Sequence, residues 1–243
     1  MSSSISRRWF LALAGAAMIA RRGFVLAAEK VPGVPTDLDH ILFGVSDLDH
    51  GIAWMEERSG VRAAFGGVHP GRGTRNALLA LGPRRYLEII APDPAQTGQG
   101  PGQDMAEGLR TLQEPRLINW AAHTNDLAAL VQKATASGIA IEGPRDGSRA
   151  RPDGKMLRWK SFSLKDNAGG ALPFFIEWSR DSVHPSNDSP SGCRLLQFSV
   201  ETPKAKDVAG VAGKLSLGLS VKSGSHMRLS ARIRGKKGEF ELN

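Results

Sequence analysis

The stretch LDHILFGVSDL at residues 38–48 carries the two signals that decide the fold. It opens with an apolar run of the kind that forms a buried strand. Asp47 then follows as a helix N-cap, and apolar residues recur at helical spacing until Gly60, which ends the helix. Further strands are expected at residues 61–63, 75–81 and 85–91, the last within YLEIIAPDP. This segment therefore predicts a βαβββ unit.

The same order of elements recurs twice along the chain, and such self-similarity decides the fold class. In the second copy Asp126 is the expected N-cap and Gly138 the stop, between strands at residues 117–123, 139–141, 157–164 and 172–178. In the third copy the strands are expected at residues 195–200, 219–221, 227–234 and 239–242. We predict an α+β fold of tandem βαβββ units at residues 37–94, 115–187 and 194–243.

The repeated unit, the words HPGRGTRN at residues 69–76 and LPFFIEW at 172–178, and the pair His184-Pro185 together resemble the glyoxalase-like domains of the vicinal oxygen chelate superfamily. The resemblance covers residues 37–187. It implies that the first two units pair so that their curved sheets enclose a cavity, barrel-like in shape, where the chemistry takes place.

Composition predicts a globular chain. With 243 residues, 41% of them hydrophobic and 23% charged, the chain is long enough to bury a sizeable core and too polar for a multispan membrane protein. The one cysteine, Cys193, excludes an internal disulfide and a cysteine-based zinc site.

The N-terminal residues predict export. The sequence SRRWFLA at residues 6–12 resembles the twin-arginine signal, and the apolar run at residues 9–20 is shorter than the ~20 residues that cross a bilayer. We expect residues 1–28 to be a signal peptide and the mature protein to be periplasmic or extracellular, with no membrane span. The alternative is a cytosolic protein with a basic N-terminus.

Charge argues against nucleic-acid binding. The net charge is +8, and without residues 1–28 the remaining 28 basic and 24 acidic residues leave +4. Residues 194–243 hold ten basic and four acidic residues, but their basic turn has no interleaved aromatic residues, so we expect a solvated hairpin there. Binding of anionic polymers by this basic unit is a further alternative.

The resemblance also implies a metal site. Members that bind a metal take one ligand from the first strand and one from the last strand of each unit, which here gives His40, Glu88 and Glu177, with Asn119 in place of the fourth ligand. One nitrogen and several hard oxygens suit a divalent ion, with Mn, Fe, Ni, Mg and Zn not distinguished. The alternative makes His40 a hydrogen-bonded core residue and the glutamates solvated cleft residues.

Four residues are expected to contact the small-molecule ligand. His69 and Asn76 match positions that recur in glyoxalase-like sequences, and Asn119 faces the predicted cavity. Strand alternation puts His123 on the same face, but roughly 13 Å further along the strand, which is near the mouth of the cavity.

Two functions follow from these predictions. The first is a metal-dependent lyase, isomerase or dioxygenase-type enzyme in which Glu88 or Glu177 acts as a base. Lactoylglutathione lyase activity is disfavoured, because the ligand quartet is imperfect and an exported protein meets little glutathione. The second is a metal-free protein that binds or sequesters a small molecule.

The third unit has no fourth unit to pair with, so its sheet has an edge or face left to cover. We expect a homodimer formed through this unit, and covering of the sheet within the chain is the alternative.

Overall fold

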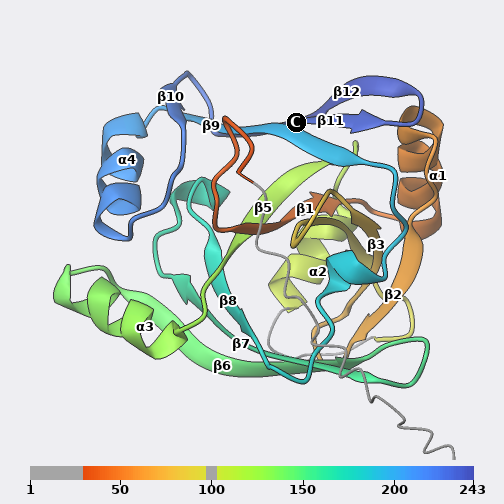
Figure 1. Ribbon diagram of the computed structural model, residues 1–243, viewed down its shortest axis with the longest axis horizontal. Helices are drawn as coiled ribbons and strands as arrows, with labels where there is room; N and C mark the ends of the chain where they lie inside the picture. Colours follow the sequence, from red (N-terminus) through yellow and green to blue (C-terminus); the bar gives the residue numbers. More distant parts are fainter. Residues whose placement is uncertain (1–29, 97–102) are drawn as a thin grey trace, which may run out of the picture.

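The computed structural model describes residues 30–96 and 103–243, so the predicted signal peptide at residues 1–28 lies outside the described residues. Within the described residues the strands form one sheet of eight and one of four (Figure 1). None of the described helices has the length and apolar character that a membrane-crossing helix requires.

The first unit follows the predicted order. It consists of β1 (Leu38–Gly44), α1 (Leu48–Ser59), β2 (Ala64–His69), β3 (Thr74–Ala80) and β4 (Tyr86–Pro92). The Asp47 side chain accepts a hydrogen bond from the backbone N–H of His50 at 2.8 Å, and Gly60 ends α1 in the left-handed conformation at φ 72°. Both are the end signals expected from the sequence. The second strand begins three residues later than predicted, at Ala64.

The second unit repeats this plan. It consists of β5 (Arg116–His123), α3 (Leu127–Ala136), β6 (Ile141–Ala150), β7 (Met156–Leu164) and β8 (Phe174–Trp178). Asp126 caps α3 as predicted, accepting from the Ala129 N–H at 2.9 Å. Strand β6 is much longer than the predicted residues 139–141. Three elements were not predicted from the sequence: the helix α2 (Gln103–Arg110) before this unit and the 3-10 turns η1 (Ala168–Gly170) and η2 (Pro185–Asn187).

The two units join into one curved sheet with the strand order β2-β3-β4-β1-β5-β8-β7-β6. Strands β1 and β5 pair antiparallel at its centre, and each also pairs parallel with the last strand of its own unit. At the sheet's two ends β2 and β6 approach each other, where the Arg149 side chain donates to the backbone oxygen of Gly66. The prediction of paired βαβββ units around a cavity is confirmed.

The alternation of side chains along the strands separates core from cavity. On the outer face, residues such as Ile41, Phe43 and Trp120 belong to one large apolar core that also includes residues of α1 and α3. On the inner face, His40 and Glu88 line a cavity.

The third unit covers part of this outer face. It consists of β9 (Arg194–Thr202), α4 (Ala205–Lys214), β10 (Val221–Ser223), β11 (Arg228–Gly235) and β12 (Gly238–Leu242), with the strand order β10-β9-β11-β12. Phe198 of β9 packs against Trp120 of β5 with ring centroids 5.2 Å apart, and both rings are fully buried. The apolar face that was expected to need a second copy is thus covered within the chain, and that reason for a homodimer is lost.

Candidate functional site

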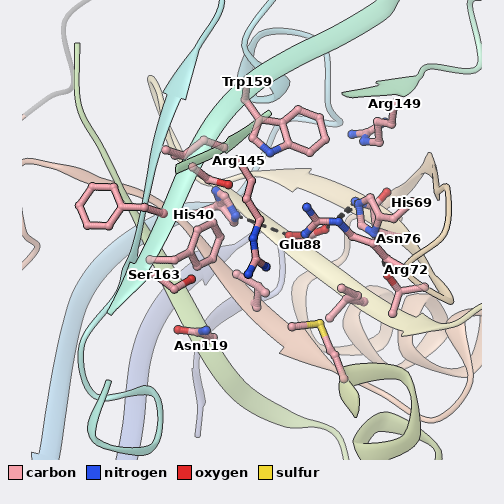
Figure 2. A pocket seen from close by; sticks show the side chains of 18 of the residues that line it. His40, His69, Arg72, Asn76, Glu88, Asn119, Arg145, Arg149, Trp159 and Ser163 are labelled. Atoms are coloured by element: carbon pink, nitrogen blue, oxygen red, sulfur yellow. Dashed lines mark hydrogen bonds and ion pairs between the residues drawn. The ribbon is translucent and has the colours of Figure 1, made fainter. Parts of the chain in front are cut away.

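The cavity between the first two units has a volume of about 220 Å³, and every strand of the eight-stranded sheet contributes to its wall. Its wall contains both aromatic and titratable side chains, and the aromatic ones include Trp159, Phe174 and Trp178. Figure 2 shows Trp159 beside Arg145. Leu109 of α2 packs against Leu42 and Ile90, so this helix closes part of the inner face.

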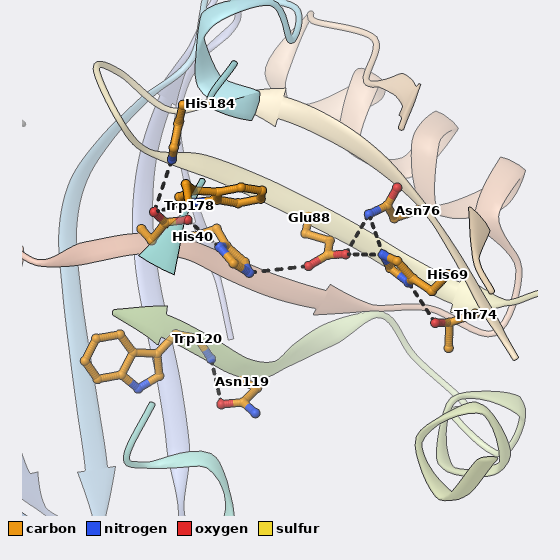
Figure 3. A network of polar contacts seen from close by, with 10 residues as sticks. His40, His69, Thr74, Asn76, Glu88, Asn119, Trp120, Trp178 and His184 are labelled. Atoms are coloured by element: carbon orange, nitrogen blue, oxygen red, sulfur yellow. Dashed lines mark hydrogen bonds and ion pairs between the residues drawn. The ribbon is translucent and has the colours of Figure 1, made fainter. Parts of the chain in front are cut away.

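The carboxylate of Glu88 lies in the cavity within 3.5 Å of three polar side chains (Figure 3). Its Oε1 accepts a hydrogen bond from the Asn76 side-chain amide at 2.6 Å. The Nε2 atoms of His40 and His69 lie 3.5 Å from Oε2 and Oε1, respectively. Thus the strands β1, β2 and β3 each place one side chain at the carboxylate that β4 carries.

These neighbours keep Glu88 ionised. Burial alone would raise the pKa of this carboxyl, but His69, His40 and the amide of Asn76 outweigh burial and hold the pKa below its ordinary value. A carboxylate that is nearly buried and still charged requires such partners.

A second buried carboxylate, Asp39, orients the His40 ring. Asp39 accepts hydrogen bonds from His40 Nδ1 at 2.7 Å, from His184 Nε2 at 3.1 Å and from Trp178 Nε1 at 3.1 Å. Burial opposes the charge, but the hydrogen bonds from His184 and His40 hold the Asp39 pKa well below its ordinary value. Because its Nδ1–H donates to Asp39, His40 presents Nε2 to the cavity. Tyr86 stacks on the His40 ring with ring centroids 4.5 Å apart.

The His69 ring is held by Thr74 and Asn76. Its Nδ1 lies 2.9 Å from Thr74 Oγ1, and its Nε2 lies 3.3 Å from the Asn76 amide nitrogen. The simplest assignment has Nδ1–H donating to Thr74 and Nε2 accepting from Asn76. Burial lowers the pKa of this imidazole, against the attraction of Glu88, in agreement with that assignment. His69 and Asn76, which were expected to contact the ligand, therefore lie beside Glu88 in the cavity wall.

Glu177 does not join these residues. Its Oε2 accepts a hydrogen bond from the backbone N–H of Leu127 at 2.8 Å, at the first turn of α3. It lines a separate surface hollow with Asp126 and Lys160. The predicted convergence of His40, Glu88 and Glu177 is wrong, because Glu177 is on the outer face of β8.

The register of the strands shows which residue is the true counterpart of Glu88. His40 and Asn119 occupy equivalent positions in the antiparallel pair of β1 and β5. Each of them pairs with the residue that lies two places after the other in the sequence. Glu88 pairs with Leu42, two places after His40. In the second unit, Phe174 pairs with the residue that lies two places after Asn119 in the sequence. The second unit thus offers an aromatic ring where the first offers a carboxylate.

Of the other two residues that were predicted to contact the ligand, Asn119 lines the cavity and His123 does not. Asn119 lines the cavity, and its Oδ1 accepts from the backbone N–H of Trp120 at 2.8 Å. His123 is half-buried and is not part of the cavity lining, so its predicted place at the rim is not observed. Its backbone N–H donates to Asp37 O at 2.7 Å.

The sequence profile of the glyoxalase-like domain matches residues 38–215. The chain belongs to this family, and thereby to the vicinal oxygen chelate superfamily. A hypothetical protein from Staphylococcus aureus has a similar structure, with a TM-score of 0.62 and 16% identity over 85% of this chain and 98% of that one.

Methylmalonyl-CoA epimerases match less well. The enzyme from Mycobacterium tuberculosis has a TM-score of 0.44 and 24% identity over 62% of this chain and 93% of its own. A Streptomyces coelicolor epimerase in complex with 2-nitronate-propionyl-CoA has a TM-score of 0.43 and 19% identity over 59% and 97%. No curated protein matches the chain.

The predicted metal site does not fit this glyoxalase-like domain. Of its three proposed protein ligands, Glu177 faces away from the cavity. The oxygen of Asn119, at the fourth position, is already an acceptor for the backbone. Within the described residues, no group of three or more His, Cys, Asp or Glu side chains is arranged to hold a metal ion.

Three arginines that line the cavity were not predicted from the sequence: Arg72, Arg145 and Arg149. Two of them belong to β6, four residues apart and therefore on one face of the strand. That alternation is visible in the sequence, but the predicted strand ended at residue 141. Asp39 was missed because it lies in an apolar run and acts through His40 and His184.

Proposed function

We propose that this glyoxalase-like domain is an enzyme in which Glu88 removes a proton from a carbon next to a carbonyl group of a small molecule. The observation that carries the proposal is the ionised, nearly buried Glu88 facing His40 across 3.5 Å inside a cavity. Because the Asn76 amide occupies Oε1, Oε2 is the oxygen that can take up the proton.

Residues of the cavity can supply and accept every proton that this reaction moves. The C–H bond breaks, a bond from the proton to Glu88 Oε2 forms, and the electron pair moves onto the carbonyl oxygen as an enolate. The proton can return to the same carbon or pass to His40 Nε2, where Asp39 stabilises the imidazolium through the 2.7 Å contact to Nδ1.

The test is solvent exchange at carbon. We expect the protein to speed the incorporation of deuterium into the methylene group of 2-oxobutanoate in heavy water, measured by NMR. Glu88→Gln removes the base and should lower the protein-dependent rate about 100-fold or more. Glu177→Gln is the matched control, because Glu177 lies outside the cavity, and should leave the rate unchanged.

Two outcomes contradict the proposal. The first is exchange that survives Glu88→Gln, and the second is wild-type protein that gives no acceleration. The second outcome would favour a binding or sequestering protein, a function supported by Phe174, which puts an aromatic wall where a second acid–base group would lie.

We also propose that the protein is exported by the twin-arginine route, on the basis of Arg7 and Arg8 within SRRWFLA. Changing both to Lys should keep the protein in the cytoplasm with its N-terminus intact, as measured by cell fractionation and N-terminal sequencing. Unchanged export of this double variant would contradict the proposal.

A further inference from the structure

Three arginine side chains enter the cavity that contains Glu88. Arg145 and Arg149 come from β6, and Arg72 comes from the turn between β2 and β3. Figure 2 shows the Arg145 side chain reaching from its strand into the middle of the cavity, between Glu88 and Asn119. The second unit thus presents Arg145 and Arg149 to the same cavity to which the first unit presents Glu88 and Arg72.

Within the described residues, none of these three guanidinium groups forms an ion pair with a carboxylate. Arg149 is only 4% exposed, and its Nη1 donates to the backbone oxygen of Gly66. Burial lowers the pKa of Arg149, while Tyr86 and Glu88 oppose that effect. A buried cation without an anionic partner is rare, because no ionic interaction compensates for the hydration free energy that it loses on burial.

The fixed acidic groups do not balance these arginines. The cavity wall has two carboxylates, Glu88 and Glu142, against three guanidinium groups. Glu88 is already held by Asn76 and two imidazole rings, and Glu142 is exposed. An anion from outside the chain would compensate for the excess positive charge.

The rest of the wall suits a flat apolar group. Trp159 and Trp178 meet with ring centroids 5.6 Å apart, and both line the cavity. A Cβ atom at Gly147 would come within 2.3 Å of the Trp159 ring, so the indole lies directly against the backbone of β6. Gly147 also lies between the two β6 arginines in the alternation of that strand, which places aromatic and cationic surfaces side by side.

We infer that the ligand of this cavity is a small, flat organic molecule with one oxyanion, a carboxylate or a phosphate. The inference deepens the proposed function and rests on the same cavity. Arg145 binds the oxyanion, Arg72 and Arg149 add to the positive potential, and the flat part lies along Trp159. At about 220 Å³, the cavity is smaller than the ~300–1,000 Å³ of typical ligand pockets, so the part of the ligand it encloses is small.

The test measures binding without turnover. Quenching of tryptophan fluorescence, with calorimetry as a second method, would follow titrations of the full chain with benzoate, phenyl phosphate and benzamide. These probes share one ring and differ in the attached group. We expect at least one of the two anions to bind about 10-fold or more tightly than the neutral amide.

Substitutions at Arg145 locate the site. Arg145→Gln should weaken binding of the preferred anion about 10-fold and leave benzamide unchanged, whereas Arg145→Lys should retain part of the affinity. Because Arg145 is exposed, its loss leaves the core intact. Arg158→Gln is the matched control: Arg158 lies on the neighbouring strand β7, pairs with the exposed Asp181 and does not line the cavity.

Every outcome decides the inference. Preferred binding of an anion that depends on Arg145 supports it, and the anion preferred distinguishes carboxylate from phosphate. Equal binding of anions and amide, absence of anion binding at millimolar concentrations, or full affinity in Arg145→Gln would overturn it. Failure of the proposed function is separate, since the exchange rate could vanish while anion binding persists, or persist while the three probes bind equally.

Discussion

At the residue scale, Asp39 links the cavity to the rest of the chain. It is completely buried, and it accepts hydrogen bonds from His40, His184 and Trp178. His40 faces Glu88, Trp178 lines the cavity, and His184 lies before the turn η2. One carboxylate therefore fixes three side chains that come from distant parts of the sequence.

Asp39 also predicts acid sensitivity. Its pKa in the folded protein lies below the ordinary value of 3.8, so its stabilisation is complete above that value and is lost as the pH falls further. Asp39→Asn should cost about 3 kcal/mol of unfolding free energy at neutral pH, because one charged acceptor for three donors is lost.

The measurement is urea unfolding at several pH values. The difference between wild type and Asp39→Asn should shrink as the pH drops below the unfolded-state pKa. Asp181→Asn, which removes an exposed ion pair, is the control and should change stability by less than ~1 kcal/mol. A difference that stays constant down to strongly acidic pH would argue against Asp39 as the source.

At the scale of single elements, the sequence predicts strand existence better than strand register. His40 and Glu88 were placed in the cavity by the resemblance, which takes one residue from the first and one from the last strand of each unit, and both end signals of α1 show where the first strand ends. In FFIEW of β8 the residues on both faces are largely apolar, so the sequence does not distinguish a register with Glu177 inside from one with Ile176 inside. A shift of one residue exchanges the two faces of a strand, which is why the predicted place of Glu177 inside the cavity was wrong.

The arginines of β6 were missed for a related physical reason. This strand reads IEGPRDGSRA, with Gly and Pro that usually interrupt strands and few apolar residues. Its residues tolerate exposure because it lies at the end of the sheet, paired only with β7 among the described strands. The position of β6 therefore depends on tertiary contacts, such as that of Arg149 with Gly66, which a local pattern does not reveal.

At the scale of the whole molecule, one apolar core spans both sheets. It includes Phe43 and Trp120 from the large sheet and Phe198 and Ile233 from the small one. Backbone hydrogen bonds also cross between them, since Leu117 N donates to the oxygen of the last residue at 2.8 Å. The third unit is therefore structurally part of one body with the units that form the cavity.

A shared core predicts cooperative unfolding. Phe198→Ala removes a fully buried ring from the contact with Trp120, so it should cost about 3–5 kcal/mol and still leave a single transition. Far-UV circular dichroism and tryptophan fluorescence should give coincident curves, because the tryptophans occupy both the shared core and the cavity wall. Phe65→Ala is the matched control, since Phe65 is 48% exposed, and should change stability by less than ~0.5 kcal/mol. Two separate transitions, with only the earlier one shifted by Phe198→Ala, would mean instead that the small sheet unfolds independently and that the cavity persists without it.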